Sequence, residues 1–378
     1  MLDGNYLKNT RIVDEGMVVG VDWDAVDDVK SELYKGHGMA VDIHYSKEAY
    51  NNERGTLYQY MYKEANHIVQ LVGWNDDYPA DNFTWKEGEV SHTPLGNGAW
   101  LCKNSWGSQT YGYDINGVTY YRDWGIKDEN GNGTGFFWIS YYDGGINGIE
   151  SLTFTDKLAD EKGLIYLCYD YLGDDNEYSW AYNTPIKTSN VFYTYCGELE
   201  AVSIKTSDYD SEVTVRMYLD VTDSPESGKP IYEKELTIPY AGIHVLYFDE
   251  HIPVKDGHLL SVVVEERTAD GKYIFGAASM DGKEKSKLID DTQYGVGIIN
   301  KGESFLFKDG EWTDWSLAVE EYKVEYPGVE FDNFGIKVFE VESVHEETNY
   351  VYIGILTAII ILAAISLLHF HRNGSRRR

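Results

Sequence analysis

The second half of the chain consists of short runs in which apolar and polar residues alternate, and this pattern restricts the fold more than any other feature. Turn-forming residues such as Lys255-Asp256-Gly257 and Lys308-Asp309-Gly310 separate the runs. Many short alternating strands at even spacing predict a β-sandwich. We expect strands, with no helix between them, at Glu198–Lys205, Ser211–Val221, Ile231–Ile238, Gly242–Phe248, Leu259–Glu266 and Gly335–Val341.

The first part of the chain, up to about residue 155, mixes a helix with strands. Residues 22–35 begin with Asp22, a good helix cap, and then place apolar residues at helical spacing: Trp23, Val26, Val29 and Leu33. Residues 76–98 and 108–135 are polar and predict loops. Strands are expected at Met39–Tyr45, Ile68–Asn75, Trp100–Lys103 and Phe136–Tyr142, and the second is apolar almost throughout, which predicts a buried strand.

Two clusters in this part carry candidate chemistry. A histidine at the mouth of a strand can act as a base, and an asparagine that ends a neighbouring strand can accept a hydrogen bond from its far ring nitrogen. That bond fixes the tautomer and aims the near nitrogen at a thiol, while a tryptophan can keep water away. Singly, each residue has an ordinary structural explanation. The clusters are Asn66-His67-Ile68-Val69-Gln70-Leu71-Val72-Gly73-Trp74 and Trp100-Leu101-Cys102-Lys103-Asn104-Ser105-Trp106-Gly107.

These two clusters, followed by Gly135-Phe136-Phe137-Trp138-Ile139-Ser140-Tyr141, resemble the β-rich right-hand domain of papain-like cysteine peptidases. The resemblance covers about residues 10–150 and implies that His67 is the catalytic histidine and Asn104 its orienting asparagine. It further implies that Trp106 is the shielding tryptophan, supported by Ser105 and Gly107, and that residues 36–43 line the substrate cleft. Candidate substrate-pocket residues are Asp42, Asn66 and Ile68, and an acid at position 42 would favour a basic substrate side chain.

The chain departs from the family pattern at the nucleophile. In the family, the catalytic cysteine lies on a helix well over a hundred residues before the histidine. Here only 66 residues precede His67, and none is a cysteine. Cys102, which lies in a predicted strand, cannot replace it. We therefore expect a chain that begins where the two peptidase domains meet, is inactive by itself, and receives the left-hand domain from upstream or from another chain.

Cysteine usage and net charge narrow the function classes further. Three cysteines are too few for a disulfide framework; a bridge between Cys168 and Cys196 is an alternative to two buried thiols, which we favour. The net charge of −31 repels phosphate backbones and argues against nucleic-acid binding. No cofactor is expected, and no metal either: the calcium-like run at Asp128 has Ile139 where the bidentate glutamate would stand, which favours a plain turn.

The C-terminus predicts a membrane anchor. Residues 351–368 carry no charge and span about 27 Å as a helix, close to the thickness of a bilayer core. Arginines follow, so the positive-inside rule places the C-terminus in the cytoplasm and the bulk outside it. The expected organisation is a right-hand peptidase domain at 1–155, a β-sandwich at 160–341, a linker at 342–349, a transmembrane helix at 350–370 and a basic tail at 371–378.

The sequence thus predicts a mainly β (α+β) protein with two competing functions. The first is a membrane-anchored, extracytoplasmic cysteine peptidase acting on proteins or peptides, with a lectin-like sandwich similar to that of an extracellular bacterial subgroup of the family. The second is a non-catalytic surface protein whose sandwich binds glycan or protein. Aromatic residues of the sandwich could stack on sugars or simply pack in its core, and they are Trp180, Tyr182, Trp312 and Trp315.

Overall fold

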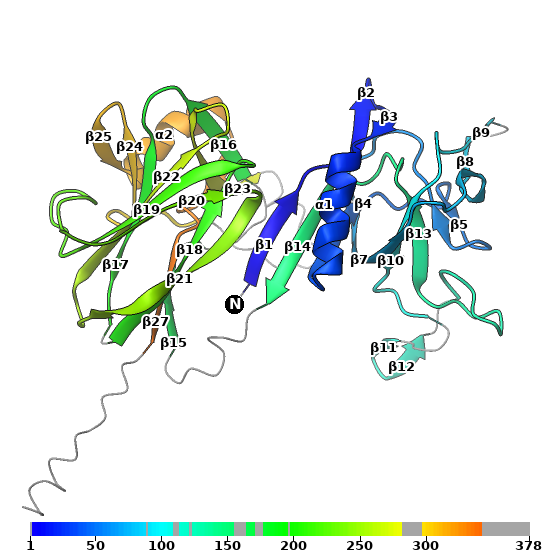
Figure 1. The fold of residues 1–378 in the computed structure, drawn as a ribbon, viewed down its shortest axis with the longest axis horizontal. Helices are drawn as coiled ribbons and strands as arrows, with labels where there is room; N and C mark the ends of the chain where they lie inside the picture. The colour runs from blue at the N-terminus through cyan, green and yellow to red at the C-terminus, as the bar shows by residue number, and fades with distance from the viewer. Residues whose placement is uncertain are drawn as a thin grey trace, which may run out of the picture.

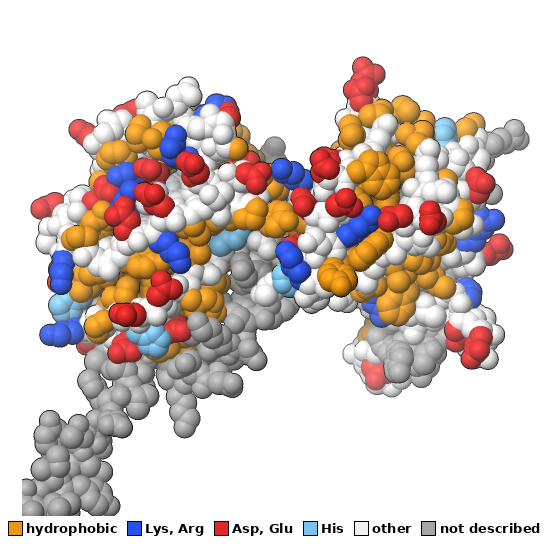
Figure 2. Space-filling model, viewed as in Figure 1, with side chains coloured by type: hydrophobic (Ala, Val, Ile, Leu, Met, Phe, Trp, Pro, Cys, Tyr) orange, Lys and Arg blue, Asp and Glu red, His pale blue; other side chains and the backbone are white. Residues whose placement is uncertain are grey.

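The computed structural model describes residues 2–87, 90–108, 113–120, 123–154, 164–170, 177–195, 197–281 and 297–341. Within these ranges the protein is mainly β, as expected, and its elements form two lobes (Figure 1). The space-filling view shows an indentation between the lobes and acidic side chains spread over both, so the negative charge on this face is diffuse (Figure 2).

The first lobe contains one long helix and a run of strands. The helix α1 (Trp23–Tyr34) begins after Asp22, whose carboxylate accepts a hydrogen bond from the amide of Ala25 at 3.2 Å, as its cap position predicts. The strands and the short 3-10 helix η1 are β1 (Leu2–Leu7), β2 (Arg11–Asp14), β3 (Met17–Val21), β4 (Gly38–Ile43), β5 (Tyr50–Asn51), β6 (Thr56–Leu57), β7 (His67–Asn75), η1 (Ala80–Asn82), β8 (Trp85–Glu87), β9 (Val90–His92), β10 (Ala99–Lys103), β11 (Tyr113–Ile115), β12 (Val118–Tyr120), β13 (Phe136–Ser140) and β14 (Gly148–Phe154).

The second lobe is built from longer strands and one helix. The six strands expected there are confirmed; five shift by one or two residues at their ends, and the strand expected at Gly242–Phe248 continues to Val254. The helix α2 (Trp315–Glu325) was not expected, although Asp314 caps it and Trp315, Val319 and Tyr322 repeat at helical spacing toward the core. The strands are β15 (Leu164–Leu167), β16 (Glu177–Tyr182), β17 (Lys187–Tyr193), β18 (Gly197–Thr206), β19 (Ser211–Leu219), β20 (Lys229–Ile238), β21 (Ala241–Val254), β22 (Leu259–Arg267), β23 (Tyr273–Asp281), β24 (Ser304–Lys308), β25 (Glu311–Asp314), β26 (Val329–Phe331) and β27 (Lys337–Val341).

One continuous sheet joins the two lobes. Its twelve strands follow the order β15-β27-β18-β21-β1-β14-β4-β7-β10-β13-β6-β5, so β1 lies between β14 of the first lobe and β21 of the second. Gly4 pairs with Leu152 on one side and with Ile243 on the other. Lys8 adds a salt bridge to Asp210 at 3.7 Å across the same junction. The lobes are therefore hydrogen-bonded into one framework.

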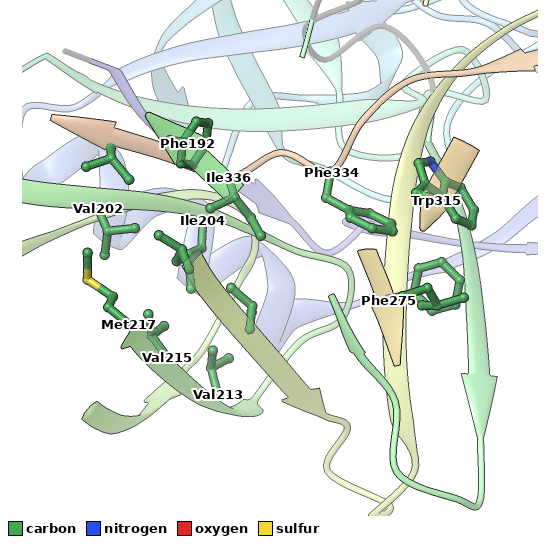
Figure 3. Close-up of a cluster of buried hydrophobic side chains, with 14 of the residues drawn as sticks. Phe192, Val202, Ile204, Val213, Val215, Met217, Phe275, Trp315, Phe334 and Ile336 are labelled. Atoms are coloured by element: carbon green, nitrogen blue, oxygen red, sulfur yellow. The ribbon is translucent and has the colours of Figure 1, made fainter. Parts of the chain in front are cut away.

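Each lobe has its own apolar core. In the first, α1 packs Val26 and Val29 against Val41, Val69 and Leu71 of the sheet. In the second, residues of β18 face residues of β19, as the labelled Val202, Ile204, Val213, Val215 and Met217 show in Figure 3. Two buried layers that interdigitate in this way form a sandwich core.

One expectation, the burial of a strand, is wrong, and the expected C-terminal segments lie outside the described residues. Strand β7 is not buried throughout: its residues alternate, with Val69 and Leu71 in the core and Ile68, Val72 and Trp74 exposed on the other face. The expected linker, transmembrane helix and tail all lie beyond residue 341 and so outside the described residues. Among the residues that are described, neither helix has the length and apolar character that crossing a membrane requires.

Candidate active site

His67 and Asn104 meet at one end of two neighbouring strands. His67 is the first residue of β7, and Asn104 directly follows β10, which pairs with β7 through Lys103 and Gln70. The Nε2 atom of His67 lies 2.9 Å from Oδ1 of Asn104. Because an amide oxygen only accepts, this contact places the ring proton on Nε2. Among the described residues no hydrogen bond to Nδ1 of His67 is seen, so that nitrogen is available as a base.

The backbone around Asn104 holds its side chain in place. Asn104 is 2% exposed, and its amide donates to the carbonyl of Gly135 at 3.0 Å. Lys103 donates from Nζ to the carbonyl oxygen of Asn104 at 3.1 Å. Gly107 has a φ of +85°, a conformation that glycine adopts without strain, and so lets the chain turn away directly after Trp106. Ser105 is exposed and makes no described contact with the pair.

An aromatic wall covers the pair. The Trp106 ring stacks on His67 with 4.7 Å between centroids and 25° between planes, as the resemblance implied. Tyr45 meets Trp106 edge-on at 4.7 Å, and Trp124 meets it edge-on at 5.5 Å. The sequence reading missed both of these supports. For Trp124 a signal existed, since Trp124-Gly125 repeats the dipeptide Trp106-Gly107.

Asn66 supports the aromatic wall and is not among the residues that line the groove beside the pair. Its Oδ1 accepts from the amide of Tyr45 at 2.8 Å, and its Nδ2 donates to the carbonyl of Tyr45 at 3.1 Å. This two-bond clamp fixes the backbone from which the Tyr45 ring projects onto Trp106. The prediction of a substrate-pocket role for Asn66 therefore receives no support from its position, because both polar atoms of the side chain are engaged.

A groove of about 530 Å³ begins beside the pair and runs over the open face of the sheet. Asn104 and Ser105 form one end of it, and Ala40, Ile68 and Leu152 give it an apolar floor. Ile68 therefore lies where a substrate-pocket residue is expected. Asp42 pairs with Ile68 across β4 and β7 but is absent from the groove lining.

Asp42 and Glu150 give this end of the sheet a partly buried acidic character. Burial raises the pKa of the Asp42 carboxyl above its ordinary value. Burial also raises the pKa of Glu150, and the nearby charge of Asp42 adds to the effect.

None of the described cysteines is placed to act as the nucleophile. Cys102 is fully buried in the core of the first lobe, and burial raises the pKa of its thiol far above the ordinary value, so it is an inert structural thiol. Cys168 follows β15, at the far end of the joined sheet, and is a free, half-buried thiol. A bridge from Cys168 to Cys196 is therefore wrong. The favoured alternative holds for Cys168 as a free thiol, although it is half-buried, and Cys196 lies outside the described residues.

A buried carboxylate organises the loop after β13. Asp143 is fully buried and accepts from the amides of Gln59 at 2.6 Å and Gly145 at 2.7 Å. Burial raises the pKa of Asp143 to about 7, opposed by those amides and by the charge of Arg11. Gly145 in turn accepts a backbone hydrogen bond from His44 at 2.8 Å, next to Tyr45. This loop therefore anchors the end of β4 that leads into the aromatic wall.

Two weaker sequence signals resolve as ordinary structure. Asp128 accepts from the amides of Asn130 at 2.9 Å and Asn132 at 2.8 Å and so closes a turn on itself. Over the described part of the chain no group of acidic, histidine and cysteine residues is arranged to hold a metal ion. Trp180 and Trp315 are buried in the core of the second lobe, which rules them out as sugar-stacking platforms.

The other two aromatic residues in that set are engaged in packing. The hydroxyl groups of Tyr182 and Tyr322 lie 3.1 Å apart, and Trp312 donates from its indole nitrogen to Glu226 at 3.1 Å. Core packing, the second explanation left open by the sequence, therefore accounts for Trp180, Tyr182 and Trp315, whereas Trp312 is half-buried and packs against Phe307 at 5.4 Å.

Comparison with known proteins supports both lobes. Residues 6–122 match the model of the papain family cysteine protease, and residues 165–339 match the lectin like domain. A search of curated proteins finds no match.

Two solved structures share the arrangement. One is the cysteine protease and lectin-like domains of Cwp84, a surface layer associated protein of Clostridium difficile, with a TM-score of 0.57, 21% identity, and coverage of 83% of this chain and 61% of that one. The other is a variant of the clostridial cysteine protease Cwp84 after propeptide cleavage, with a TM-score of 0.58, 19% identity, and coverage of 90% and 71%. This chain thus spans less than two thirds of the first of these structures. Taken together, these comparisons show a part similar to papain family cysteine proteases, which contains the His67–Asn104 pair, followed by a part similar to lectin-like domains, in the fold that the two solved structures share.

Proposed function

We propose that this chain provides the base and the orienting residue of a cysteine peptidase that cleaves proteins or peptides. The observation that carries the proposal is the 2.9 Å contact between Nε2 of His67 and Oδ1 of Asn104 beneath the Trp106 ring. This contact holds the imidazole in one tautomer with Nδ1 as the acceptor, which is what proton transfer to and from a thiol requires.

The chemistry then assigns a role to each group. Nδ1 of His67 takes the proton from a cysteine thiol, and the thiolate attacks the peptide carbonyl carbon. The tetrahedral intermediate collapses, the C–N bond breaks, and the imidazolium returns the proton to the leaving amine. Water then hydrolyses the thioester with His67 as base, which restores the thiol. Asn104 stabilises the imidazolium, and Trp106 limits access of water to their hydrogen bond.

We further propose that the thiol comes from a segment outside the sequence described here, upstream or on another chain. Cys102 is buried in the core and Cys168 lies at the opposite end of the sheet, so neither of the two described cysteines reaches His67. Support also comes from two exposed apolar side chains on β7 that lie outside the groove lining, Val72 and Trp74. A complementary segment seated there would bury them.

The substrate preference and cellular location follow as parts of the same proposal. The groove floor of Ala40, Ile68 and Leu152 fits an apolar substrate side chain, while Asp42 at its edge favours a basic one. The uncharged residues 351–368 and the arginines after them support membrane anchoring with the bulk outside the cytoplasm. Removal of residues 350–378 should release the protein from the membrane fraction, and continued sedimentation with membranes would contradict the anchor.

The test of the peptidase proposal is an epoxide-type probe that alkylates active-site thiolates, applied to the protein in its native genomic setting. We expect the probe to label a cysteine other than Cys102, Cys168 and Cys196 in an assembly that contains this chain. The variant His67→Ala should abolish that labelling, whereas the control Ser91→Ala, at an exposed position on β9, should not. Labelling of Cys102, or labelling that persists in His67→Ala, would overturn the assignment.

A second candidate function is binding of carbohydrate by the lectin-like domain, with the peptidase half acting only as a scaffold. The match of residues 165–339 to the lectin-like model favours the binding part of this alternative. Carbohydrate binding is also compatible with peptidase activity, since the two lobes carry separate sites. Loss of all probe labelling together with retained carbohydrate binding would favour the scaffold role.

A further inference from the structure

The lectin-like lobe has a pocket of about 490 Å³ on the open face of the sheet formed by β22, β17 and β24. Val191, Tyr193 and Leu259 form part of its floor, and Tyr193 is the direct cross-strand partner of Leu259. The pocket lies in the lobe opposite to His67 and Asn104 and shares no lining residue with the peptidase groove. None of the aromatic residues considered from the sequence lines it.

The floor offers aromatic surface to solvent. Tyr193 is 65% exposed although it ends a well-paired strand, so its ring is presented and not packed. Tyr169 supports the floor from the side: its ring stacks on Phe192 at 4.9 Å, and its hydroxyl donates to the carbonyl of Val191 at 3.0 Å. An exposed ring beside a fixed one provides a flat apolar platform.

The rim of the pocket is polar, and one wall is rigid before any ligand arrives. The Oγ of Ser227 accepts hydrogen bonds from the backbone amides of Thr222, Asp223 and Ser224 at 2.9, 3.3 and 3.4 Å. It also donates one to the carbonyl of Ser224 at 2.7 Å. This hydroxyl therefore sets the positions of three lining residues at once. A pre-formed wall lowers the ordering cost of binding.

The opposite wall is anchored to the sheet. Glu303 accepts from the amide and the side-chain nitrogen of Asn300 at 3.1 and 3.0 Å, and its carbonyl accepts from the amide of Val191 at 2.8 Å. Gly302 donates to Asp314 at 2.8 Å. Lys301 stands exposed at this rim.

The charged residues at the rim of the pocket indicate which class of ligand it can bind. The two carboxylates of Asp223 and Glu303 and the single ammonium group of Lys301 give the rim a net negative charge. The whole chain also has a net charge of −31, so anionic ligands are disfavoured. The rim combines carboxylate acceptors, hydroxyls that donate and accept, and an ammonium donor. A pyranose ring matches this set, because one of its faces is apolar and its edge carries hydroxyl groups that donate and accept in turn.

We propose that this pocket binds a neutral saccharide, with a sugar face stacked on Tyr193 and hydroxyl groups bound by Asp223 and Glu303. The proposal rests on the candidate carbohydrate-binding function of the lectin-like domain and gives it a site. Because the lobes share one sheet through β1, a glycan held here would stand at a fixed position relative to the peptidase groove.

The test is saturation-transfer NMR on the full chain with the methyl glycosides of glucose, galactose, mannose and N-acetylglucosamine as probes. We expect at least one glycoside to bind, and Tyr193→Ala to weaken that binding by at least about tenfold. Tyr166→Ala is the matched control, since Tyr166 on β15 is 62% exposed and does not line the pocket. Both tyrosines are exposed, so neither change should unfold the protein.

A footprint on the unaltered protein provides an independent readout. In tyrosine nitration followed by mass spectrometry, the bound glycoside should protect Tyr193 and leave Tyr166 equally reactive. Binding that survives Tyr193→Ala at full strength would overturn this site while leaving carbohydrate binding in place. Failure of the wild-type chain to bind any of the four glycosides would overturn the saccharide proposal as a whole.

Discussion

Nε2 of His67 lies 2.9 Å from Oδ1 of Asn104, and the two residues stand at the ends of adjacent strands of one sheet. The backbone bond from Asn104 to Gly135 and the clamp of Asn66 on Tyr45 fix the two sides of this contact. The site is thus rigid at the level of the backbone, which is the condition for a histidine to keep a single tautomer.

The first prediction concerns that tautomer. Asn104→Ala removes the acceptor for the Nε2 proton, so His67 should become a mixture of its two neutral tautomers, visible in nitrogen-15 NMR of the imidazole at high pH. The lost hydrogen bond should lower the free energy of unfolding by about 1 kcal/mol. Ser105→Ala, at the exposed neighbouring position, should change neither quantity. An unaltered tautomer in Asn104→Ala would show that another group fixes the ring.

The second prediction concerns the buried carboxyl of Asp143, whose pKa is raised to about 7. Since the ordinary value is about 3.9, the folded protein holds a proton between those values that the unfolded chain has lost. This group therefore favours folding at low pH, and its contribution falls as pH rises from about 4 to about 7, by about 4 kcal/mol in total.

Asp143→Asn should remove this dependence of the free energy of unfolding on pH, as measured by urea unfolding across the same pH range. The expectation holds whether the substitution raises or lowers the free energy of unfolding at a single pH. Asp128→Asn serves as the control, because that carboxylate lies at an exposed turn. A wild-type slope unaffected by Asp143→Asn would mean that the carboxyl ionises normally in the fold.

The third prediction concerns His244, whose contribution to stability changes with pH in the opposite sense to that of Asp143. His244 on β21 is buried, its Nε2 lies 2.9 Å from Oγ1 of Thr206, and burial lowers the pKa of its ring to about 4. Between about 4 and the ordinary value of about 6.5 the unfolded chain binds the proton more strongly, so stability is lost as pH falls through this window, by about 3 kcal/mol. His244→Gln should abolish this acid sensitivity.

In the wild-type protein, the pH dependences that Asp143 and His244 give to the free energy of unfolding partly cancel in the pH range that they share. The single variants should therefore expose opposite slopes: rising stability with pH in Asp143→Asn, and falling stability with pH in His244→Gln. His258, which is half-exposed and bound to Asp220, serves as the control for the histidine change when it is replaced by Gln. Equal pH profiles for both variants would contradict the assignments.

The fourth prediction concerns the junction between the lobes. Gly242 has a φ of +129°, and a Cβ added there would lie 2.0 Å from the carbonyl oxygen of Gly4. Gly242→Ala must therefore disrupt the pairing of β1 with β21 and should cost about 3 kcal/mol or more. Calorimetry should then resolve two unfolding transitions where the wild type shows one.

The control for this change is Gly257→Ala. Gly257 also has a positive φ, +77°, but no atom lies within 4 Å of the added Cβ. Its replacement should cost about 1 kcal/mol from backbone strain alone and leave a single transition. A single transition in Gly242→Ala as well would show that the lobes stay coupled without the strand pairing.

What the sequence by itself determined is local. The cap at Asp22 and the apolar spacing after it fixed α1, because capping and a 3.6-residue period depend only on near neighbours. Alternation fixed the strands of the second lobe for the same reason. The resemblance of the two clusters to papain-like peptidases implied that His67, Asn104 and Trp106 would meet, and the structure brings them into contact.

Only the tertiary structure decided which surfaces are shared and which stay open. An apolar run cannot tell whether a second layer covers it, so β7 was expected to be buried and has an exposed face. The pairing of β1 with both lobes, the support of Trp106 by Tyr45 and Trp124, and the saccharide-sized pocket at Tyr193 all join residues far apart in the chain. Such contacts depend on how whole elements pack, and no local period encodes them.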